Sequence, residues 1–399
     1  MDATTLEIMA NSFRRYWSLD PEVTFINHGS YGACTKAVQE HQQQWRAEME
    51  KEPVLFMSKR TAMFDDARAS LAPFLGADVN DIVMVPNATH GVNAVIRSQR
   101  WQPGDQLLVT NHEYNACRNT LDFAAERWGA EVVVVDIPFP ISDPQQVIDA
   151  MLAAVTKRTV FCLIDHITSP TALVLPLEKL VPALQKQGIK VLVDGAHAPG
   201  QLPLNLAKLG ADYYTGNLHK WTCAPKGCAV LVVPKKYQAD IHPVTISHGY
   251  NADTSERSRY HQEFDWPGTF DLTAWASIPL VLEDMESKLE GGWPAIMEHN
   301  RQLALQARDY ICEAWNQEPT APDNMVGSMS TIIVPADIMA RLEQRGSDLY
   351  AELREQWGIQ VPVIPLPDPL GTAVRFSVQL YNTMDDYHKL ANAVLSMRA

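Results

Sequence analysis

An acidic residue and a lysine follow two apolar segments in the middle of this 399-residue chain. Asp194 comes directly after the apolar run 191–193, which is typical of a buried parallel strand. Lys220 follows a second short strand expected at residues 211–214. Ligands of open α/β sheets bind at the carboxyl ends of the strands, so we expect both side chains to reach one crevice.

A carboxylate and an amine in one crevice suit the chemistry of pyridoxal phosphate. A lysine holds this cofactor as a Schiff base, and an acidic residue pairs with its ring nitrogen. The carboxylate favours the protonated ring, which then stabilises a carbanion at the substrate Cα. Asp194 alone would be explained as a loop cap, and Lys220 alone as a surface lysine. The pair, with His197 and His219 beside it, favours the cofactor.

The segments around these residues resemble those of the class V, fold-type-I pyridoxal-phosphate enzymes. They read DGAHAPG (194–200) and TGNLHKW (215–221), the latter followed by APKG (224–227). The chain is most similar to the isopenicillin N epimerase-like branch, which is related to cysteine desulfurases and C–S lyases. The resemblance covers nearly the whole chain. It implies that Lys220 is the Schiff-base lysine and the base that acts at Cα, and that Asp194 is the partner of the ring nitrogen.

The resemblance also assigns the remaining cofactor contacts. The segment NATHG (87–91) lies between a strand and a helix, where free N–H groups favour a phosphate, although Asn and Thr are also ordinary helix caps. Tyr114 matches the residue whose ring stacks on the pyridine, and its hydroxyl is a possible acid. His197 matches a contact of the phenolic oxygen, with a loop histidine bonded to backbone as the alternative. The residues implied for the phosphate are Ala88, Thr89, His90, Asn217 and His219.

Three further residues match family positions near the substrate. Arg375 lies inside an apolar strand pattern and matches the arginine that grips the substrate carboxylate through two parallel bonds. Asn27 and His28 precede a Gly/Ser loop that reaches the mouth of the site in the family. For His28, a simple glycine turn explains the sequence equally well.

The segment WPGTFD (266–271) resembles a W-x-G-T-x-D segment that serves the neighbouring subunit in the family. Its Gly and Thr, here Gly268 and Thr269, reach the phosphate of the other subunit's cofactor. The resemblance therefore implies a homodimer with a shared active site. Several relatives carry Arg where this chain has Phe270, which leaves any substrate role of that side chain in doubt.

The resemblance favours epimerisation or racemisation at the Cα of an amino acid. β-Elimination by a C–S lyase is the alternative, transamination is a third reaction, and a non-enzymatic pyridoxal-binding protein is a further class. Cysteine desulfurases carry a nucleophilic cysteine shortly before the substrate arginine. Residues 361–375 contain no cysteine, which disfavours persulfide formation on that loop.

Composition restricts the partners that the protein can have. A net charge of −14 disfavours nucleic acid and anionic membranes, and no apolar run is long enough to span a bilayer. The N-terminal residues lack the apolar region of a signal peptide, and the six cysteines lack zinc-site spacing. We therefore expect a cytoplasmic protein with reduced thiols, no metal, and an amino acid as its small-molecule substrate.

Strands and helical patterns alternate through the first two thirds of the chain. Strands are expected near residues 82–85, 106–109, 131–136, 160–164, 191–194, 213–214 and 227–233. With the resemblance, this predicts an α/β protein of fold type I, whose mostly parallel seven-stranded sheet is sandwiched by helices. A smaller C-terminal α+β domain is expected to follow. The predicted divisions are an N-terminal arm (1–25) packed on the small domain, a large domain (26–270) and the small domain (271–399).

Overall fold

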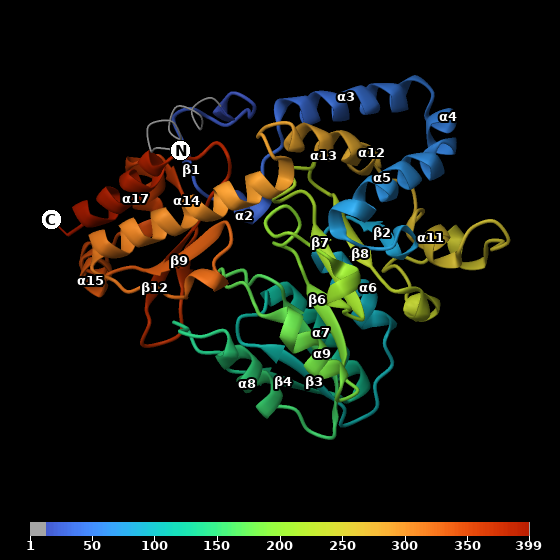
Figure 1. Ribbon diagram of the computed structural model, residues 1–399, viewed down its shortest axis with the longest axis horizontal. Coiled ribbons are helices and arrows are strands. Elements are labelled where there is room, and N and C mark those ends of the chain that lie inside the picture. Colours follow the sequence, from blue (N-terminus) through green and yellow to red (C-terminus); the bar gives the residue numbers. More distant parts are fainter. Residues whose placement is uncertain (1–12, 399) are drawn as a thin grey trace.

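The computed structural model describes residues 13–398, and its largest element is a seven-stranded sheet (Figure 1). The strand order is β2-β8-β7-β6-β5-β3-β4. β8 runs antiparallel to both of its neighbours, and the other strand pairs are parallel. The predicted α/β class and the mostly parallel sheet are confirmed. The strands are β2 (Ile82–Val85), β3 (Gln106–Thr110), β4 (Glu131–Val135), β5 (Thr159–Asp165), β6 (Lys190–Asp194), β7 (Tyr213–Asn217) and β8 (Ala229–Val232).

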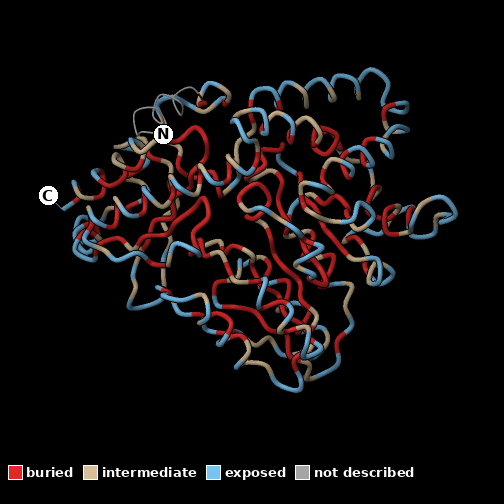
Figure 2. The backbone as a smooth tube through the Cα atoms, viewed as in Figure 1, coloured by how far each residue is buried: buried red, intermediate tan, exposed pale blue. Residues whose placement is uncertain are grey.

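Both faces of this sheet are covered, so its strands are apolar on both sides. Along β6, Leu192 packs into one hydrophobic core, whereas its neighbours Val191 and Val193 pack into the other. Every residue of β2, β7 and β8 is buried, which Figure 2 shows as a continuous buried centre. The helices that follow the strands are α6 (Ala88–Ser98), α7 (Asn115–Trp128), α8 (Gln145–Ala153), α9 (Leu177–Gln185) and α10 (Leu206–Leu209).

The segments before and after the sheet are mainly helical. The helix at residues 60–75 ends at Gly76, which adopts the left-handed conformation that terminates helices (φ 59°). A short helix at residues 259–264 was not predicted from the sequence. These segments contain α2 (His28–Tyr31), α3 (Lys36–Lys51), α4 (Pro53–Ser58), α5 (Arg60–Leu75), α11 (Arg259–Phe264), α12 (Thr273–Ala276) and α13 (Ile278–Glu286).

The smaller domain is an antiparallel three-stranded sheet, β11-β12-β9, with helices beside it. Residues 361–369 are rich in proline, and part of this segment forms β11 at the edge of this sheet, where a missing N–H is tolerated. The elements are α14 (Gly292–Trp315), β9 (Met329–Ile333), α15 (Ala336–Arg345), α16 (Leu349–Ala351), β10 (Ile359–Gln360), β11 (Val363–Pro365), β12 (Thr372–Ser377) and α17 (Met384–Ser396). Shorter helical turns are η1 (Val79–Asp81), η2 (Lys235–Asp240), η3 (His248–Asn251), η4 (Asp323–Met325) and η5 (Glu352–Gln356).

Along α14, which runs from one domain to the other in Figure 1, the packing passes from the core of the large domain to that of the small domain. Trp293 and Met297, near its start, pack in the core of the large domain together with α12 and α13. Ala304 and Trp315, further along, pack in the core of the small domain. The change of element type after residue 270 is visible in the sequence, but the packing partner of each helix is not.

The described part of the N-terminal arm contacts residues from the C-terminal part of the chain. β1 (Thr24–Phe25) pairs in parallel with β10, and the Trp17 ring packs edge-on against Tyr381 with 5.1 Å between ring centroids. Residues 1–12 of the predicted arm lie outside the described residues. Within residues 13–398, none of the helices has the length and apolar character that crossing a bilayer requires.

Candidate active site

A cavity of about 840 Å³ lies at the carboxyl ends of the sheet strands. Its walls come from the ends of β5, β6 and β7, from the start of α6 and from α2. Segments far apart in the sequence therefore meet at the position that the strand pattern predicts for a ligand. The predicted site residues that line it are Ala88, Thr89, His90, Tyr114, Asp194, His197, Asn217, His219 and Lys220.

Lys220 presents its amine to this cavity from the loop after β7. Its Nζ lies 3.0 Å from Nε2 of His197. Burial, and then the positive charge of Arg375, lower the pKa of Lys220 to about 7, while the nearby carboxyl groups oppose this shift. A large share of neutral amine at neutral pH suits a group that must attack a carbonyl or accept a proton.

The loop that carries Lys220 is held by close backbone contacts at two glycines. A Cβ atom on Gly32 (φ 68°) would lie 2.1 Å from the His219 carbonyl oxygen and 2.9 Å from Cα of Lys220. A Cβ atom on Gly200 would lie 2.6 Å from the carbonyl carbon of Trp221. Only glycine lets these segments approach so closely, so the lysine loop is fixed from both sides.

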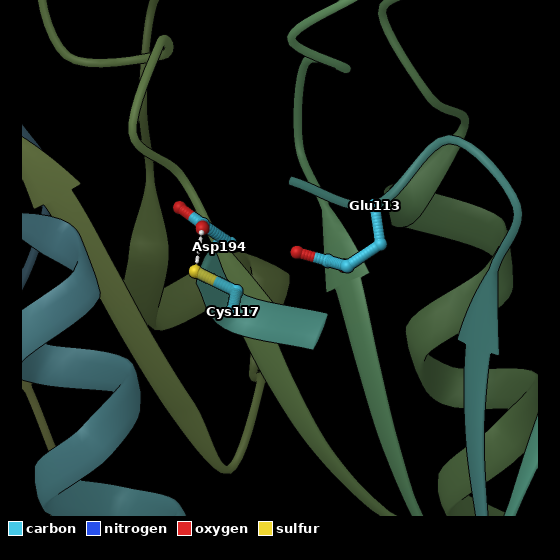
Figure 3. A group of neighbouring side chains, drawn as sticks. All are labelled: Glu113, Cys117 and Asp194. Atoms are coloured by element: carbon cyan, nitrogen blue, oxygen red, sulfur yellow. Dashed lines mark hydrogen bonds between the residues drawn. The ribbon is translucent and has the colours of Figure 1, made fainter. Parts of the chain in front are cut away.

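Asp194 is 2% exposed and has a donor for each of its oxygens. Oδ1 accepts the N–H of Ala196 at 2.9 Å, and Oδ2 accepts the thiol of Cys117 at 3.1 Å (Figure 3). Burial raises the pKa of Asp194, whereas these two hydrogen bonds and Lys220 act in the opposite direction. The two donors also fix the orientation of the carboxyl group toward the cavity.

The N-terminus of α6 forms another wall of the cavity. Asn87 caps the helix by accepting the His90 N–H at 2.9 Å, and Asn217 accepts the Ala88 N–H at 2.8 Å. Asn217 therefore ties the helix to the end of β7. Thr89 and His90 in the first turn also line the cavity, which suits an anion because the helix dipole is positive there.

Two more basic side chains face the same wall. His219 binds the carbonyl of Cys228 through Nδ1 at 2.9 Å, and burial lowers its pKa to about 4, which keeps it neutral. Lys226, which the sequence reasoning missed, lines the cavity and donates to the Gly32 carbonyl at 3.1 Å. An amine, a carboxyl group and an anion-binding helix end in one cavity fit the chemical groups of pyridoxal phosphate.

Arg375 lies one layer behind the cavity wall and is 4% exposed. Its guanidinium donates to the carbonyl of Ser169 at 2.5 Å and to Oγ of Ser30 at 3.2 Å. Ser30 and Ser169 line the cavity, so Arg375 is oriented by groups that a ligand can reach. Its Nε has no hydrogen-bond partner within residues 13–398, and burial lowers its pKa to about 10.

His28 and Asn27 do not have the cavity-lining positions expected for substrate contacts. His28 is fully buried, with Nδ1 2.8 Å from the Tyr381 hydroxyl and Nε2 3.0 Å from the carbonyl of Lys220. Asn27 accepts the hydroxyl of Ser30 at 2.5 Å. The chain forms the one-turn helix α2 here instead of a simple turn, which places Ser30 and Tyr31 at the cavity.

Gly268 and Thr269 lie on the surface, outside the set of described residues that line the cavity of this chain. Their segment is fixed at both ends, because the Trp266 ring lies 4.9 Å from the Arg60 guanidinium and Asp271 pairs with Arg46 at 3.0 Å. Among the described residues, these two therefore take no part in the cavity of their own chain.

Two acidic residues near the cavity were missed. Asp165 ends β5 beside Asp194 in the sheet register and lines the cavity. The signal was present, because an apolar run before a single Asp is the pattern that identified Asp194. Glu113, which precedes Tyr114, brings a carboxyl oxygen within 4.8 Å of ligand atoms of Cys117 and Asp194. This spacing could hold a metal ion, but burial raises the pKa of Cys117, and its thiol donates to Asp194.

Comparisons with known proteins identify relatives that span nearly the whole chain. A family profile described as Aminotransferase class-V matches residues 32–390. Isopenicillin N epimerase of Amycolatopsis lactamdurans is 32% identical over 401 residues, covering 96% of both chains. A probable chloroplastic L-cysteine desulfhydrase of Arabidopsis thaliana is 28% identical over 400 residues, covering 94% of this chain and 83% of that one. A solved C-DES variant with glycine covalently linked to its PLP cofactor has a TM-score of 0.77 at 19% identity, covering 96% and 98%.

Proposed function

The chain belongs to the class-V aminotransferase family, and from that premise we propose that it is a pyridoxal-phosphate enzyme that epimerises an amino acid at Cα. The observation that carries the proposal is the buried Lys220 amine in one cavity with Asp194. The similarity to isopenicillin N epimerase over 96% of both chains supports it. Epimerisation also needs two proton-transfer groups, and Lys220 and Tyr114 approach the cavity from different elements.

Bound pyridoxal phosphate would supply an electron sink for the bond that breaks at Cα. Asp194, already oriented by two donors, would favour a proton on the ring nitrogen. The start of α6, with Thr89 and His90, would hold the phosphate, and Asn217 and His219 complete that wall. His197, 3.0 Å from the lysine amine, orients that amine within the cavity.

Lys220 takes the Cα proton in this proposal, because its lowered pKa leaves a neutral amine available near neutral pH. Tyr114 returns a proton from its own side of the cavity and thereby inverts the centre. Arg375 binds the substrate carboxylate together with the hydroxyl groups of Ser30 and Ser169, which lie between its guanidinium and the cavity.

We also propose that the active enzyme is a homodimer. Gly268 and Thr269 lie outside the cavity of their own chain, so they are available to the neighbouring subunit. Tyr31 and Tyr114 line the cavity mouth and are 74% and 47% exposed in the single chain. A partner subunit that covers these rings would exclude water from the reaction.

β-Elimination is the second candidate, since the chain is similar to plant L-cysteine desulfhydrases. The described residues that line the cavity include no cysteine, so a sulfur leaving group would depart to solvent and not to an enzyme thiol. Both reactions begin with removal of the Cα proton by Lys220. They differ in the second step, which is either the return of a proton to Cα or the loss of a group from Cβ.

The decisive experiment is incubation of the holoenzyme with L- and D-amino acids in deuterated water. Epimerisation predicts deuterium at Cα of both recovered and inverted amino acid, without release of pyruvate, ammonia or thiol. Stoichiometric pyruvate and thiol from a cysteine derivative would instead establish the lyase and refute the epimerase proposal.

A further inference from the structure

Three carboxyl groups meet beneath the cavity, where the proposed function uses only one. Glu113 follows β3, Asp165 ends β5 and Asp194 ends β6, and these three strands are neighbours in the sheet. Asp165 is directly opposite Asp194 in the parallel register. Side chains opposite each other on neighbouring strands lie side by side, so the two carboxyl groups share one environment.

The three groups differ in their hydrogen bonds. Asp194 receives the thiol of Cys117 and the N–H of Ala196. Oδ2 of Asp165 and both oxygens of Glu113 are buried and have no partner within residues 13–398. Figure 3 shows the Glu113 carboxyl group pointing toward the Cys117–Asp194 pair without a bond to it. A carboxylate that accepts two donors is stabilised as an anion, whereas an unpartnered buried carboxylate is not.

Few positive charges are available to balance three anions here. The positive charge that acts on both Asp165 and Asp194 is that of Lys220, whose own pKa is lowered to about 7. Burial first, and then the neighbouring carboxyl groups, raise the pKa values of Asp165 and Glu113 well above their usual range. The other titratable or charged groups that face the three carboxyl groups are Cys117 and Arg118 of α7, Cys162 of β5 and Tyr214 of β7.

We propose that this group of three carries a single negative charge, on Asp194, and that Asp165 stays protonated and donates a hydrogen bond to an oxygen of the bound cofactor. Glu113 stays protonated as well, so it adds no second negative charge beside Asp194. The proposal rests on the proposed function for the identity of the cofactor. It assigns Asp165, which lines the cavity and has one buried oxygen without a partner within residues 13–398, a role that a carboxylate cannot fill, because a carboxylate only accepts hydrogen bonds.

The protonation states can be tested without cofactor or substrate. Infrared difference spectra between wild type and Asp165→Asn, recorded on the cofactor-free protein at neutral pH, should show loss of one protonated-carboxyl band. Glu113→Gln should remove another. Asp149→Asn is the matched control, since Asp149 is exposed on α8 and accepts a hydrogen bond from the Gln145 side chain, so only a carboxylate band should disappear. Loss of a carboxylate band in Asp165→Asn would overturn the proposal.

The donor role is tested by the affinity of the protein for pyridoxal phosphate. Asp165→Ala removes the donor and should weaken binding about tenfold, as expected for a hydrogen bond to a charged or electron-rich group. Asp165→Asn keeps an N–H donor at the same place and should recover most of the affinity. An asparagine variant as weak as the alanine variant would show that an N–H donor at this position does not support binding, and would refute the proposal.

The two tests separate this proposal from the proposed function. A wild-type protein that fails to bind pyridoxal phosphate would refute the function, while the infrared bands would still report the protonation of Asp165 and Glu113. Thermal unfolding of each cofactor-free variant confirms that the fold is retained. If the alanine variant unfolds, the asparagine variant still tests the proposal. Loss of a carboxylate band in its difference spectrum, together with weakened binding of pyridoxal phosphate, would contradict the proposal.

Discussion

The floor of the cavity and its rim are built in different ways. The floor, which we define as Lys220, Asp194 and Asp165, lies at or just after the carboxyl ends of three sheet strands, and its two carboxyl groups are buried while Lys220 is half-buried. The rim, defined as Tyr31, Tyr114 and, in the proposed dimer, the segment 266–271 of the neighbouring subunit, consists of residues at the surface of the single chain, and the side chains of Tyr31 and Tyr114 are exposed. The floor is complete within one chain, whereas the rim leaves surface that only a ligand or a second subunit can cover.

The floor carries the reaction step that epimerases and desulfhydrases have in common, whereas the rim carries the groups that we expect to distinguish the two reactions. The floor supplies an amine and a carboxyl group, which suffice to remove a proton from Cα. Epimerases and desulfhydrases both need that step, so the floor alone does not choose between them. The rim supplies the second proton-transfer group and limits access of water, and we expect the choice of reaction to depend on it.

The largest effect is expected at the floor. Lys220→Ala removes both the amine that attaches the cofactor and the base that acts at Cα, so turnover should fall about 10⁴-fold or more. Borohydride reduction followed by peptide mapping should label Lys220 in wild type and no lysine in the variant. The cavity should still bind pyridoxal phosphate noncovalently through the wall at α6. A label on a different lysine would show that the floor has been assigned incorrectly.

The next effect is expected at the rim and concerns only one of the two proton transfers. Tyr114→Phe should slow inversion about 10²-fold, in the range of a lost general acid, because the ring remains and the hydroxyl is removed. Exchange of the Cα proton with deuterated water should fall much less, since Lys220 can still exchange it on its own side. Equal losses of inversion and exchange would mean that Tyr114 only positions the cofactor.

The sequence predicted the floor better than it predicted the rim. Strand ends are visible as an apolar run followed by one polar residue, which is why Asp194 and the cavity-lining position of Lys220 were found. Asp165 follows the same rule and was overlooked. Seven strands were placed within a few residues, because a sheet buried on both faces requires long apolar runs.

The positions of side chains that depend on the path of a loop could not be predicted from apolar runs. The sequence placed Asn27 and His28 near the substrate, but the turn of helix α2 directs Ser30 and Tyr31 there. The change of packing partner along α14 could not be predicted for a similar reason, since α14 is one continuous helix whose two halves pack against different cores. Hydrophobic periodicity shows that a helix has an apolar face, but not which partner covers it.

His28, which is hydrogen-bonded to the carbonyl of Lys220, allows a test of the buried packing beside the floor. Burial lowers its pKa from 6.5 to about 3, so the unfolded chain takes up a proton before the folded one as the pH falls. Stability should therefore decrease from pH 6.5 toward pH 3, by up to about 1.4 kcal/mol per pH unit from this residue. His28→Gln lacks this titration, and denaturant unfolding between these limits should show a correspondingly smaller pH slope. Parallel slopes for the two proteins would contradict the buried, neutral state of His28.

The smallest effect is expected at the segment 266–271, which lies outside the cavity of its own chain. Thr269→Ala should weaken retention of pyridoxal phosphate about fivefold, since it removes one hydrogen bond across the proposed dimer interface. Thr254→Ala is the control, because Thr254 is also exposed but lies outside the segment 266–271, and it should retain the cofactor as wild type does. The loss should be seen as faster release of cofactor during dialysis, with sedimentation showing a dimer for all three proteins. A wild-type monomer that holds its cofactor and stays active at high dilution would mean that the rim is completed within one chain, and the contrast with the floor would then disappear.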